Sequence, residues 1–348
     1  MMKFSLSTNI NSVHFGDFNY IVTSNSLRVL GTLVSSYNSG VRCFTMIGTY
    51  GTGKSSFIAA LERDLLHQTK VLFENKGQFN GYKMFHAINI VGDYDTLHNQ
   101  LNKELHGFDS DTDKLFVKLG DKLQYHKRRN EFVLIVVDEF GKVLEHAANN
   151  NPEKELYFLQ KLAEFINRPE YDNVLLITTL HQNFGAYSKK LSRSQRDEWE
   201  KVKGRFKEIV FSEPVEQLLY LAASQIEQFK TKIVFKKNFD NLFELAQTSG
   251  YINRTFDYDV AKKIYPLDVF AGVALTHAIQ RYGQNERSLF TFLGSRDSNS
   301  INTFTPSASY TYNLANVYDY VIYNFYSFLS EVNADSTNWR AIRVAIER

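Results

Sequence analysis

The sequence predicts an α/β fold in which a parallel sheet is flanked by helices, followed by a mostly α-helical domain. Apolar, β-branched runs of strand length alternate with segments of helical periodicity between residues 41 and 211. This alternation is typical of a parallel sheet with helices on both faces. After Pro214 the strand-like runs cease and helical segments follow one another. We therefore expect an N-terminal extension at 1–14, an α/β domain at 15–212 and a helical domain at 213–348.

The elements follow from hydrophobic periodicity, caps and turn residues. The predicted strands cover residues 41–47, 82–91, 132–137, 174–179 and 207–211. The predicted helices of the first domain cover 24–35, 54–66, 94–106, 111–126, 153–165 and 193–203. Those of the second cover 215–228, 239–248, 258–264, 267–282 and 313–330, with a polar surface loop at 295–312. The last residues have helical spacing and no cap, so the chain is either a fragment or ends in a frayed helix.

Composition narrows the class of protein. The 348 residues are 43% hydrophobic with a net charge of +2, which is ordinary for a globular chain and neither indicates nor excludes nucleic acid. The single cysteine, Cys43, stands in an apolar run, where core packing is the expected role. No signal peptide or long apolar run is evident, so we expect a cytoplasmic protein that does not enter a membrane.

A glycine-rich loop follows the first predicted strand and opens the next helix. It matches the pattern G-x-x-x-x-G-K-[ST] at every fixed position. The matching residues are Gly48, Thr49, Tyr50, Gly51, Thr52, Gly53, Lys54 and Ser55, and Ser56 follows them. Glycines let the backbone curl so that several N–H groups face one anion, and the helix adds its positive end. Lys54 is expected to reach the β- and γ-phosphates, and the Ser55 hydroxyl to coordinate Mg²⁺. The expected ligands are ATP and Mg²⁺.

An acidic pair ends the strand FVLIVVDEF. Ligands of open α/β sheets gather at the carboxyl ends of the strands, so Asp138 is expected to hold Mg²⁺ near the phosphates. Glu139 is expected to orient the attacking water, because catalysis here is mostly positioning and charge neutralisation. An adjacent glutamate of this kind points to the additional-strand group of P-loop proteins, in which a further strand lies between the loop strand and the Asp138 strand.

The segment VLLITTLHQNF supplies that further strand. Thr178, Thr179 and His181 lie at its C-terminal end. Thr179 and His181 are the candidates to contact the γ-phosphate or the lytic water. The alternative is that the threonines are ordinary strand formers and His181 caps the next turn.

The segment EWEKVKGRFKEIVFSEP resembles the AAA+ superfamily of ATPases. In that family an arginine after the third catalytic strand reaches a neighbouring subunit's nucleotide, and Arg205 matches its position; Arg193 and Arg196 are weaker alternatives. Arg287 is expected to open an amphipathic helix of the second domain, and the resemblance implies that this domain is a lid in which Arg287 touches the γ-phosphate. A surface role is the alternative for both Arg205 and Arg287.

The stretches LHQNF, EW-x-x-V-x-GRF and YPL…QNERSLFTFL together are similar to ATPases of bacterial anti-phage defence loci, including BREX-type systems. This resemblance implies a self-assembling regulatory or motor ATPase, acting as a homo-oligomer or with an effector protein. Two alternatives stay open: a DNA- or RNA-dependent motor or loader, and a nucleotide-gated scaffold with negligible turnover.

Other polar features are interpreted structurally. The basic clusters at 126–129 and 230–237 are expected to be solvated, although either is able to meet a phosphate backbone. The nine histidines and one cysteine show no metal-ligand spacing along the chain.

Overall fold

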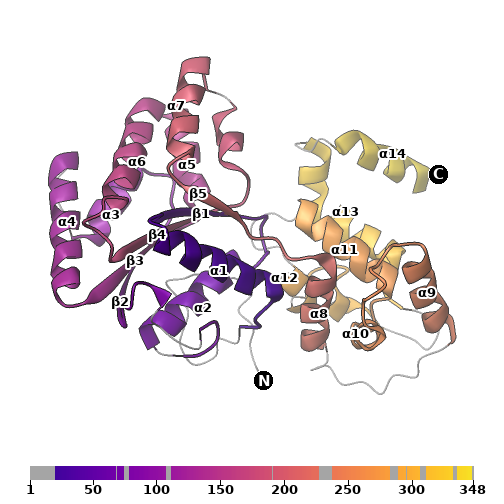
Figure 1. The fold of residues 1–348 in the computed structure, drawn as a ribbon. Helices are drawn as coiled ribbons and strands as arrows, with labels where there is room; N and C mark the ends of the chain where they lie inside the picture. The colour runs from indigo at the N-terminus through magenta and orange to yellow at the C-terminus, as the bar shows by residue number, and fades with distance from the viewer. Residues whose placement is uncertain are drawn as a thin grey trace. The chain divides into compact units, whose positions relative to one another are not determined.

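The computed structural model describes residues 20–67, 69–73, 78–106, 111–189, 191–226, 237–282, 289–294, 296–305, 311–331 and 335–346 (Figure 1). The chain divides into two compact units: the first comprises residues 1–49 and 53–212, and the second residues 50–52 and 213–348. Within the described residues, no helix is long and apolar enough to span a bilayer.

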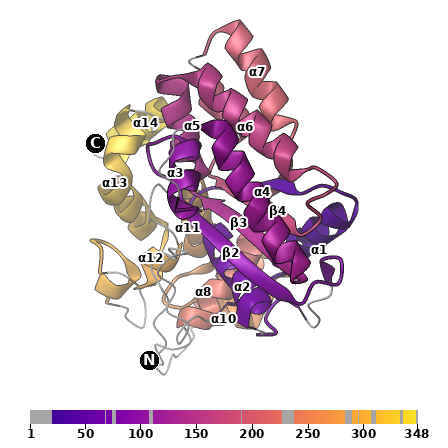
Figure 2. The same ribbon diagram turned by 90° about the vertical axis from the view of Figure 1, so that its left-hand side faces the viewer.

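A parallel sheet forms the centre of the first unit. Its strands are β1 (Cys43–Ile47), β2 (Met84–Val91), β3 (Glu131–Asp138), β4 (Val174–Leu180) and β5 (Lys207–Val210). They are ordered β2-β3-β4-β1-β5, and each neighbouring pair is parallel. The strand β4 therefore lies between β1 and β3, which confirms the additional strand predicted from the sequence. Strands β2 and β5 form the two edges, and Figure 2 shows the β2 edge from the front.

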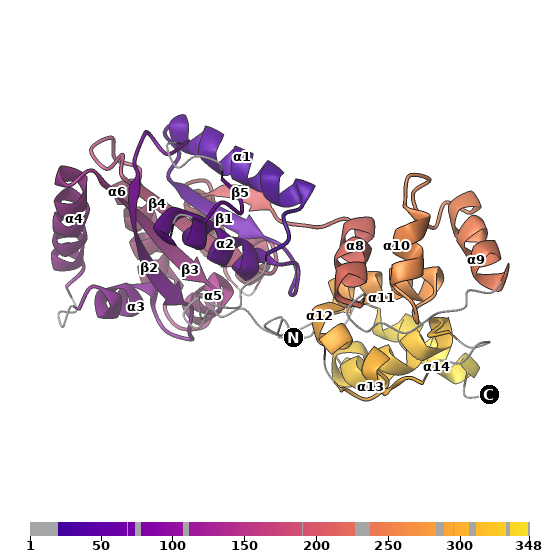
Figure 3. The ribbon, with the colours of Figure 1, turned by 90° about the horizontal axis from the view of Figure 1, so that it is seen from below.

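Helices cover both faces of this sheet, which confirms the predicted fold class. They are α1 (Ser24–Asn38), α2 (Lys54–His67), α3 (Leu97–Glu104), α4 (Thr112–Arg128), α5 (Phe140–Asn149), α6 (Pro152–Ile166), the 3₁₀ turn η2 (Phe184–Ser188) and α7 (Arg193–Lys203). The α1–α2 pair lies across one face and α3 to α7 over the other (Figures 1 and 3). Pro152 occupies the first turn of α6, as predicted, with Asn151 as its cap.

The alternation of side chains along β3 explains this layering. Phe132, Leu134 and Val136 join the core under α1 and α2, whereas Val133, Ile135 and Val137 join the core under α4 to α6. Successive residues of a strand face opposite sides of the sheet, and full burial of each large apolar side chain stabilises the fold by roughly 1.5–3 kcal/mol. Cys43 is fully buried in the second of these cores, as expected.

The second unit is helical. Its elements are α8 (Val215–Ile226), α9 (Lys237–Thr248), α10 (Tyr258–Lys263), α11 (Val269–Tyr282), α12 (Leu289–Gly294), η3 (Ile301–Thr303), α13 (Leu314–Glu331) and α14 (Ser336–Ile346). The helix α11 packs on α8 and α13. An added Cβ at Gly272 of α11 would lie 3.1 Å from Leu219 of α8, so the absence of a side chain lets these two helices approach closely.

Three features differ from the sequence-based expectations. The helix α5 is not among the predicted helices; it begins directly after β3, with Glu139 in the left-handed conformation and no side-chain cap. The predicted surface loop at 295–312 is wrong for Ser300, Ile301 and Tyr312, which are buried. His126, in the basic cluster expected to be solvated, is buried against Glu131.

Candidate functional site

The predicted phosphate loop connects the carboxyl end of β1 to the first turn of α2. The Gly48 amide donates to Leu180 O of β4 (3.0 Å), so the loop leaves the sheet only after that residue. Gly51 (φ +71°) and Gly53 (φ +93°) hold the left-handed backbone that only glycine adopts at low cost. No acidic residue occupies the first turn of α2, whose leading N–H groups lack intrahelical acceptors. Such a curl before a helix N-terminus suits an anion.

Lys54 is buried at the first position of α2. Its Nζ donates to Thr49 O (2.9 Å) and to Gly48 O, two carbonyls of the loop itself. Burial lowers the pKa of Lys54 to about 8, and the charge of Asp138 opposes this effect. The ammonium therefore lies in a poorly solvated position where a phosphate would favour its charged form.

Asp138 and Thr179 meet where β3 and β4 end. Thr179 Oγ1 donates to Asp138 Oδ1 (2.5 Å), and both side chains are buried. The Glu139 amide donates to the same carboxylate oxygen (3.1 Å) and to Thr179 Oγ1 (3.0 Å). These bonds fix one oxygen of a buried carboxylate. Of the two threonines considered at this strand end, Thr178 instead bonds inside the sheet, to Thr45 Oγ1 at 2.9 Å.

Glu139 follows Asp138 in a left-handed conformation (φ +54°) that costs energy for a residue other than glycine. This geometry turns the chain directly from β3 into α5. The Glu139 side chain is 45% exposed and forms an ion pair with Lys142. The backbone conformation thus separates a buried Asp138 from an exposed Glu139, although the two are adjacent in sequence.

Gly92 is a feature of this region that the sequence does not indicate. Its amide donates to Asp138 O (2.7 Å), and an added Cβ would lie 2.5 Å from Glu139 O. Any side chain at this position would displace the strand end that carries the acidic pair.

His181 follows β4 and contacts Tyr187. The Tyr187 hydroxyl lies 3.1 Å from Nδ1 and 3.4 Å from Nε2 of the ring. Burial, and secondly the charge of Lys54, lower the pKa of His181 to about 4. The imidazole is therefore neutral at pH 7. Because His181 follows β4 and the loop of Lys54 follows the neighbouring β1, both residues lie at the carboxyl end of the sheet.

Glu62 of α2 is a second residue that sequence reasoning missed. Its carboxyl is buried: Oε2 accepts from Asn89 Nδ2 of β2 (3.1 Å), whereas Oε1 has no hydrogen-bond partner among the described residues. Burial raises the pKa of Glu62 to about 7; Asn89 acts against this and the charge of Asp138 acts with it. In the sequence, Glu62 directly follows the apolar stripe formed by Phe57, Ile58 and Leu61, and this position could have predicted its burial.

Arg205 does not lie at this end of the sheet. Arg205 precedes β5, at the amino end of a strand parallel to β1, and its guanidinium pairs with Glu164 of α6 (Nε–Oε1 3.0 Å). Arg287 lies outside the described residues. Ser55 and Ser56 occupy the first turn of α2, both half-buried.

No protein-family model matches the chain, and no curated protein sequence matches it. Among solved structures, PCH-2 of C. elegans is similar over 91% of this chain and 72% of its own, with a TM-score of 0.40 and 13% identity. The structure of the Aeropyrum pernix ORC2 protein in ADPNP–ADP complexes is similar over 73% of this chain and 70% of its own, with a TM-score of 0.42 and 12% identity. Its ADP form covers 79% of this chain and 78% of its own (TM-score 0.39, 13% identity). Likenesses this remote assign no residue a role.

Proposed function

We propose that the chain binds ATP at the loop Gly48–Ser55 and hydrolyses it to ADP and phosphate with Mg²⁺. One observation carries the proposal: the buried Lys54, the buried Asp138 with its hydrogen-bonded Thr179, and His181 all lie at the end of the sheet where β1, β3 and β4 finish. A lysine at a helix N-terminus, facing a buried carboxylate, is a combination suited to a metal-bound polyphosphate.

The donor set fits Mg²⁺, which prefers oxygen ligands and retains several waters. Asp138 would supply the carboxylate and Ser55 a hydroxyl, and Thr179 holds Asp138 in place through its 2.5 Å hydrogen bond. Bound Mg²⁺ would neutralise charge on the phosphate oxygens. Lys54 would exchange the carbonyls of Gly48 and Thr49 for phosphate oxygens.

Glu139 would act as the residue that orients water. Its side chain is exposed and forms an ion pair with Lys142, so its carboxylate is accessible from solvent. The neutral His181 would contribute a hydrogen bond to the γ-phosphate or the water, held by Tyr187. Arg205 would act on the nucleotide of a second copy, because within its own chain it lies at the amino end of β5.

The biological process in which this ATPase activity acts is a further part of the proposal. A self-assembling regulatory or motor ATPase of anti-phage defence, with a helical lid from residue 213 and an effector partner, is supported by the sequence resemblance alone. A motor driven by DNA or RNA, and a scaffold that binds ATP without turnover, are the competing functions. Tenfold stimulation of turnover by nucleic acid would favour the motor.

Turnover of Glu139→Gln tests the proposal. The variant keeps the size of the side chain at an exposed position, so the fold is retained. We expect ATP binding to persist and turnover to fall by roughly 10²–10⁴-fold, the usual contribution of a positioned base. Glu145→Gln, an exposed glutamate of α5, is the matched control and should keep wild-type turnover. Equal rates for the two variants would refute the role of Glu139, and no turnover in the wild type would favour the scaffold.

A further inference from the structure

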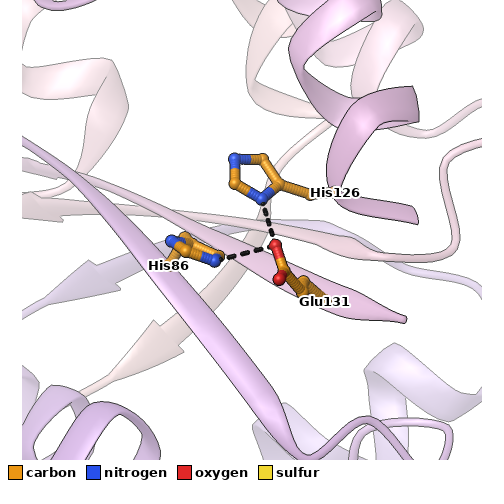
Figure 4. Close-up of side chains that lie close together, drawn as sticks. All are labelled: His86, His126 and Glu131. Atoms are coloured by element: carbon orange, nitrogen blue, oxygen red, sulfur yellow. Dashed lines mark hydrogen bonds and ion pairs between the residues drawn. The ribbon is translucent and has the colours of Figure 1, made fainter. Parts of the chain in front are cut away.

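Three side chains of metal-ligating types meet at the amino end of the sheet, whereas the phosphate loop lies at its carboxyl end. His86 lies near the start of β2, Glu131 is the first residue of β3, and His126 is in the last turn of α4 (Figure 4). Glu131 pairs with Met84 in the parallel register, two residues before His86, so the two strands place these side chains together. The loop Gly48–Ser55 follows the other, carboxyl end of the sheet.

One nitrogen of each ring faces the same carboxylate oxygen. His126 Nδ1 lies 2.7 Å and His86 Nε2 2.9 Å from Glu131 Oε2. The ring centroids are 4.1 Å apart. One potential ligand atom from each of the three residues lies within 4.8 Å of the others. Such convergence of two imidazoles on one oxygen is more than a single ion pair requires.

The second carboxylate oxygen of Glu131, Oε1, is bound by a residue outside the three-residue cluster. Arg129 Nε donates to Glu131 Oε1 (2.8 Å), which leaves Oε2 directed at the two histidines. A carboxylate fixed in this way beside two imidazole rings resembles the arrangement in which neighbouring groups orient metal ligands.

His86 Nε2 is poorly satisfied by the protein. The atom is buried, and although it is 2.9 Å from Oε2, it has no hydrogen bond of acceptable geometry among the described residues. The ring as a whole is 44% exposed, on the edge strand of the sheet. Rotation of this half-exposed ring would present the nitrogen to a cation from solvent without opening the core.

We propose that His86, His126 and Glu131 bind a divalent transition-metal cation of the Zn²⁺ type. Two imidazole nitrogens and one carboxylate oxygen are preferred Zn²⁺ donors, and a water completes the four ligands. Tetrahedral bonds of about 2.0–2.1 Å separate ligand atoms by roughly 3.3 Å. The observed 2.7 and 2.9 Å separations must therefore widen by roughly half an ångström. Rotation of the half-exposed His86 ring would widen the 2.9 Å separation, and the 2.7 Å separation would require a small rotation of the His126 ring away from Glu131.

The site would tie the edge strand β2 to β3 and α4. A cation bound only by the folded protein raises its stability by mass action. The site is thus structural or regulatory, is independent of the proposed ATPase, and uses none of its residues.

Zn²⁺ titration of the full chain, stripped with EDTA and free of nucleotide, tests the proposal. Isothermal titration calorimetry should show one saturable site, and added Zn²⁺ should raise the melting temperature. Co²⁺ should give the visible absorption of a tetrahedral complex. In His86→Ala we expect the affinity for Zn²⁺ to fall by at least about tenfold and the thermal shift to disappear. His98→Ala, a half-buried histidine of α3 outside the cluster, should bind as the wild type does.

Two further variants make the result decisive. His86→Cys replaces one Zn²⁺ ligand by another, so it should restore binding and exclude misfolding as the cause of the loss. Asp138→Asn should keep the Zn²⁺ site, because Asp138 lies at the carboxyl end of β3 and Glu131 at its amino end. Equal Zn²⁺ affinity in the wild type and His86→Ala would overturn the proposal, as would loss of binding in Asp138→Asn.

Discussion

Thr179→Val tests whether the hydroxyl between β3 and β4 holds Asp138 in place. The substitution keeps the shape of a side chain that is 2% exposed and removes its oxygen. That oxygen donates to Asp138 Oδ1 at 2.5 Å and accepts from the Glu139 amide at 3.0 Å. The amide retains Asp138 Oδ1 as a second acceptor at 3.1 Å, so only the carboxylate loses a donor.

The magnitude follows from that balance. A hydrogen bond to a charged group contributes about 1.5–3 kcal/mol, and we take about 2 kcal/mol as the loss in unfolding free energy. At roughly 2–4 °C per kcal/mol for a unit of this size, the melting temperature should fall by about 4–8 °C. If the same loss appears in the transition state, turnover of ATP should fall by about 30-fold.

Urea denaturation without nucleotide or Mg²⁺, followed by an ATP turnover assay, measures both effects. Thr179→Ser is the matched control, because it keeps the hydroxyl and loses only a methyl group. We expect the serine variant to stay within a few-fold of wild-type turnover. Valine and serine variants with the same turnover would show that the hydroxyl does not position Asp138, and the reasoning would fail.

Two other changes probe charge and assembly. The folded-state pKa of Glu62, about 7, exceeds its ordinary value of 4.5, so the contribution of Glu62 to the free energy of unfolding is largest below pH 4.5 and is lost as the pH rises to about 7. Glu62→Gln should remove this pH-dependent loss of unfolding free energy, which amounts to up to about 3 kcal/mol. Chemical denaturation of the variant and the wild type at pH 5 and pH 8 measures the loss. The same pH dependence in both proteins would contradict the prediction. Arg205→Ala should abolish the increase of specific turnover with protein concentration, with a loss of about 10³-fold or more in the assembled state. Glu164→Gln is its control, and full turnover in Arg205→Ala would exclude the arginine from catalysis.

The sheet and its acidic strand end are predictable because the signals are local. FVLIVVDEF is apolar at every position that must face one of two cores, so both the strand and the position of Asp138 follow from it. The loop residues Gly51 and Gly53 adopt the positive φ that their type favours. The helix α5 escapes prediction because it begins after a left-handed glutamate with no capping side chain.

The remaining contacts depend on which strands become neighbours. His86 and Glu131 are far apart in sequence and meet only through the parallel register of β2 and β3. The close approach of Gly92 to Glu139 and the hydrogen bond between Glu62 and Asn89 also join distant segments. A single sequence specifies neither strand order nor register directly, so such sites follow only from the folded structure.

Equilibrium binding of Mg²⁺-ATP to Lys54→Ala tests the central claim most directly. Lys83→Ala, an exposed lysine just before β2, is the control for the loss of one positive charge. We predict that Lys54→Ala folds as the wild type does but loses at least about tenfold in affinity, about 1.4 kcal/mol, while Lys83→Ala is unchanged. Wild-type affinity in Lys54→Ala would contradict the assignment of the loop as the phosphate site.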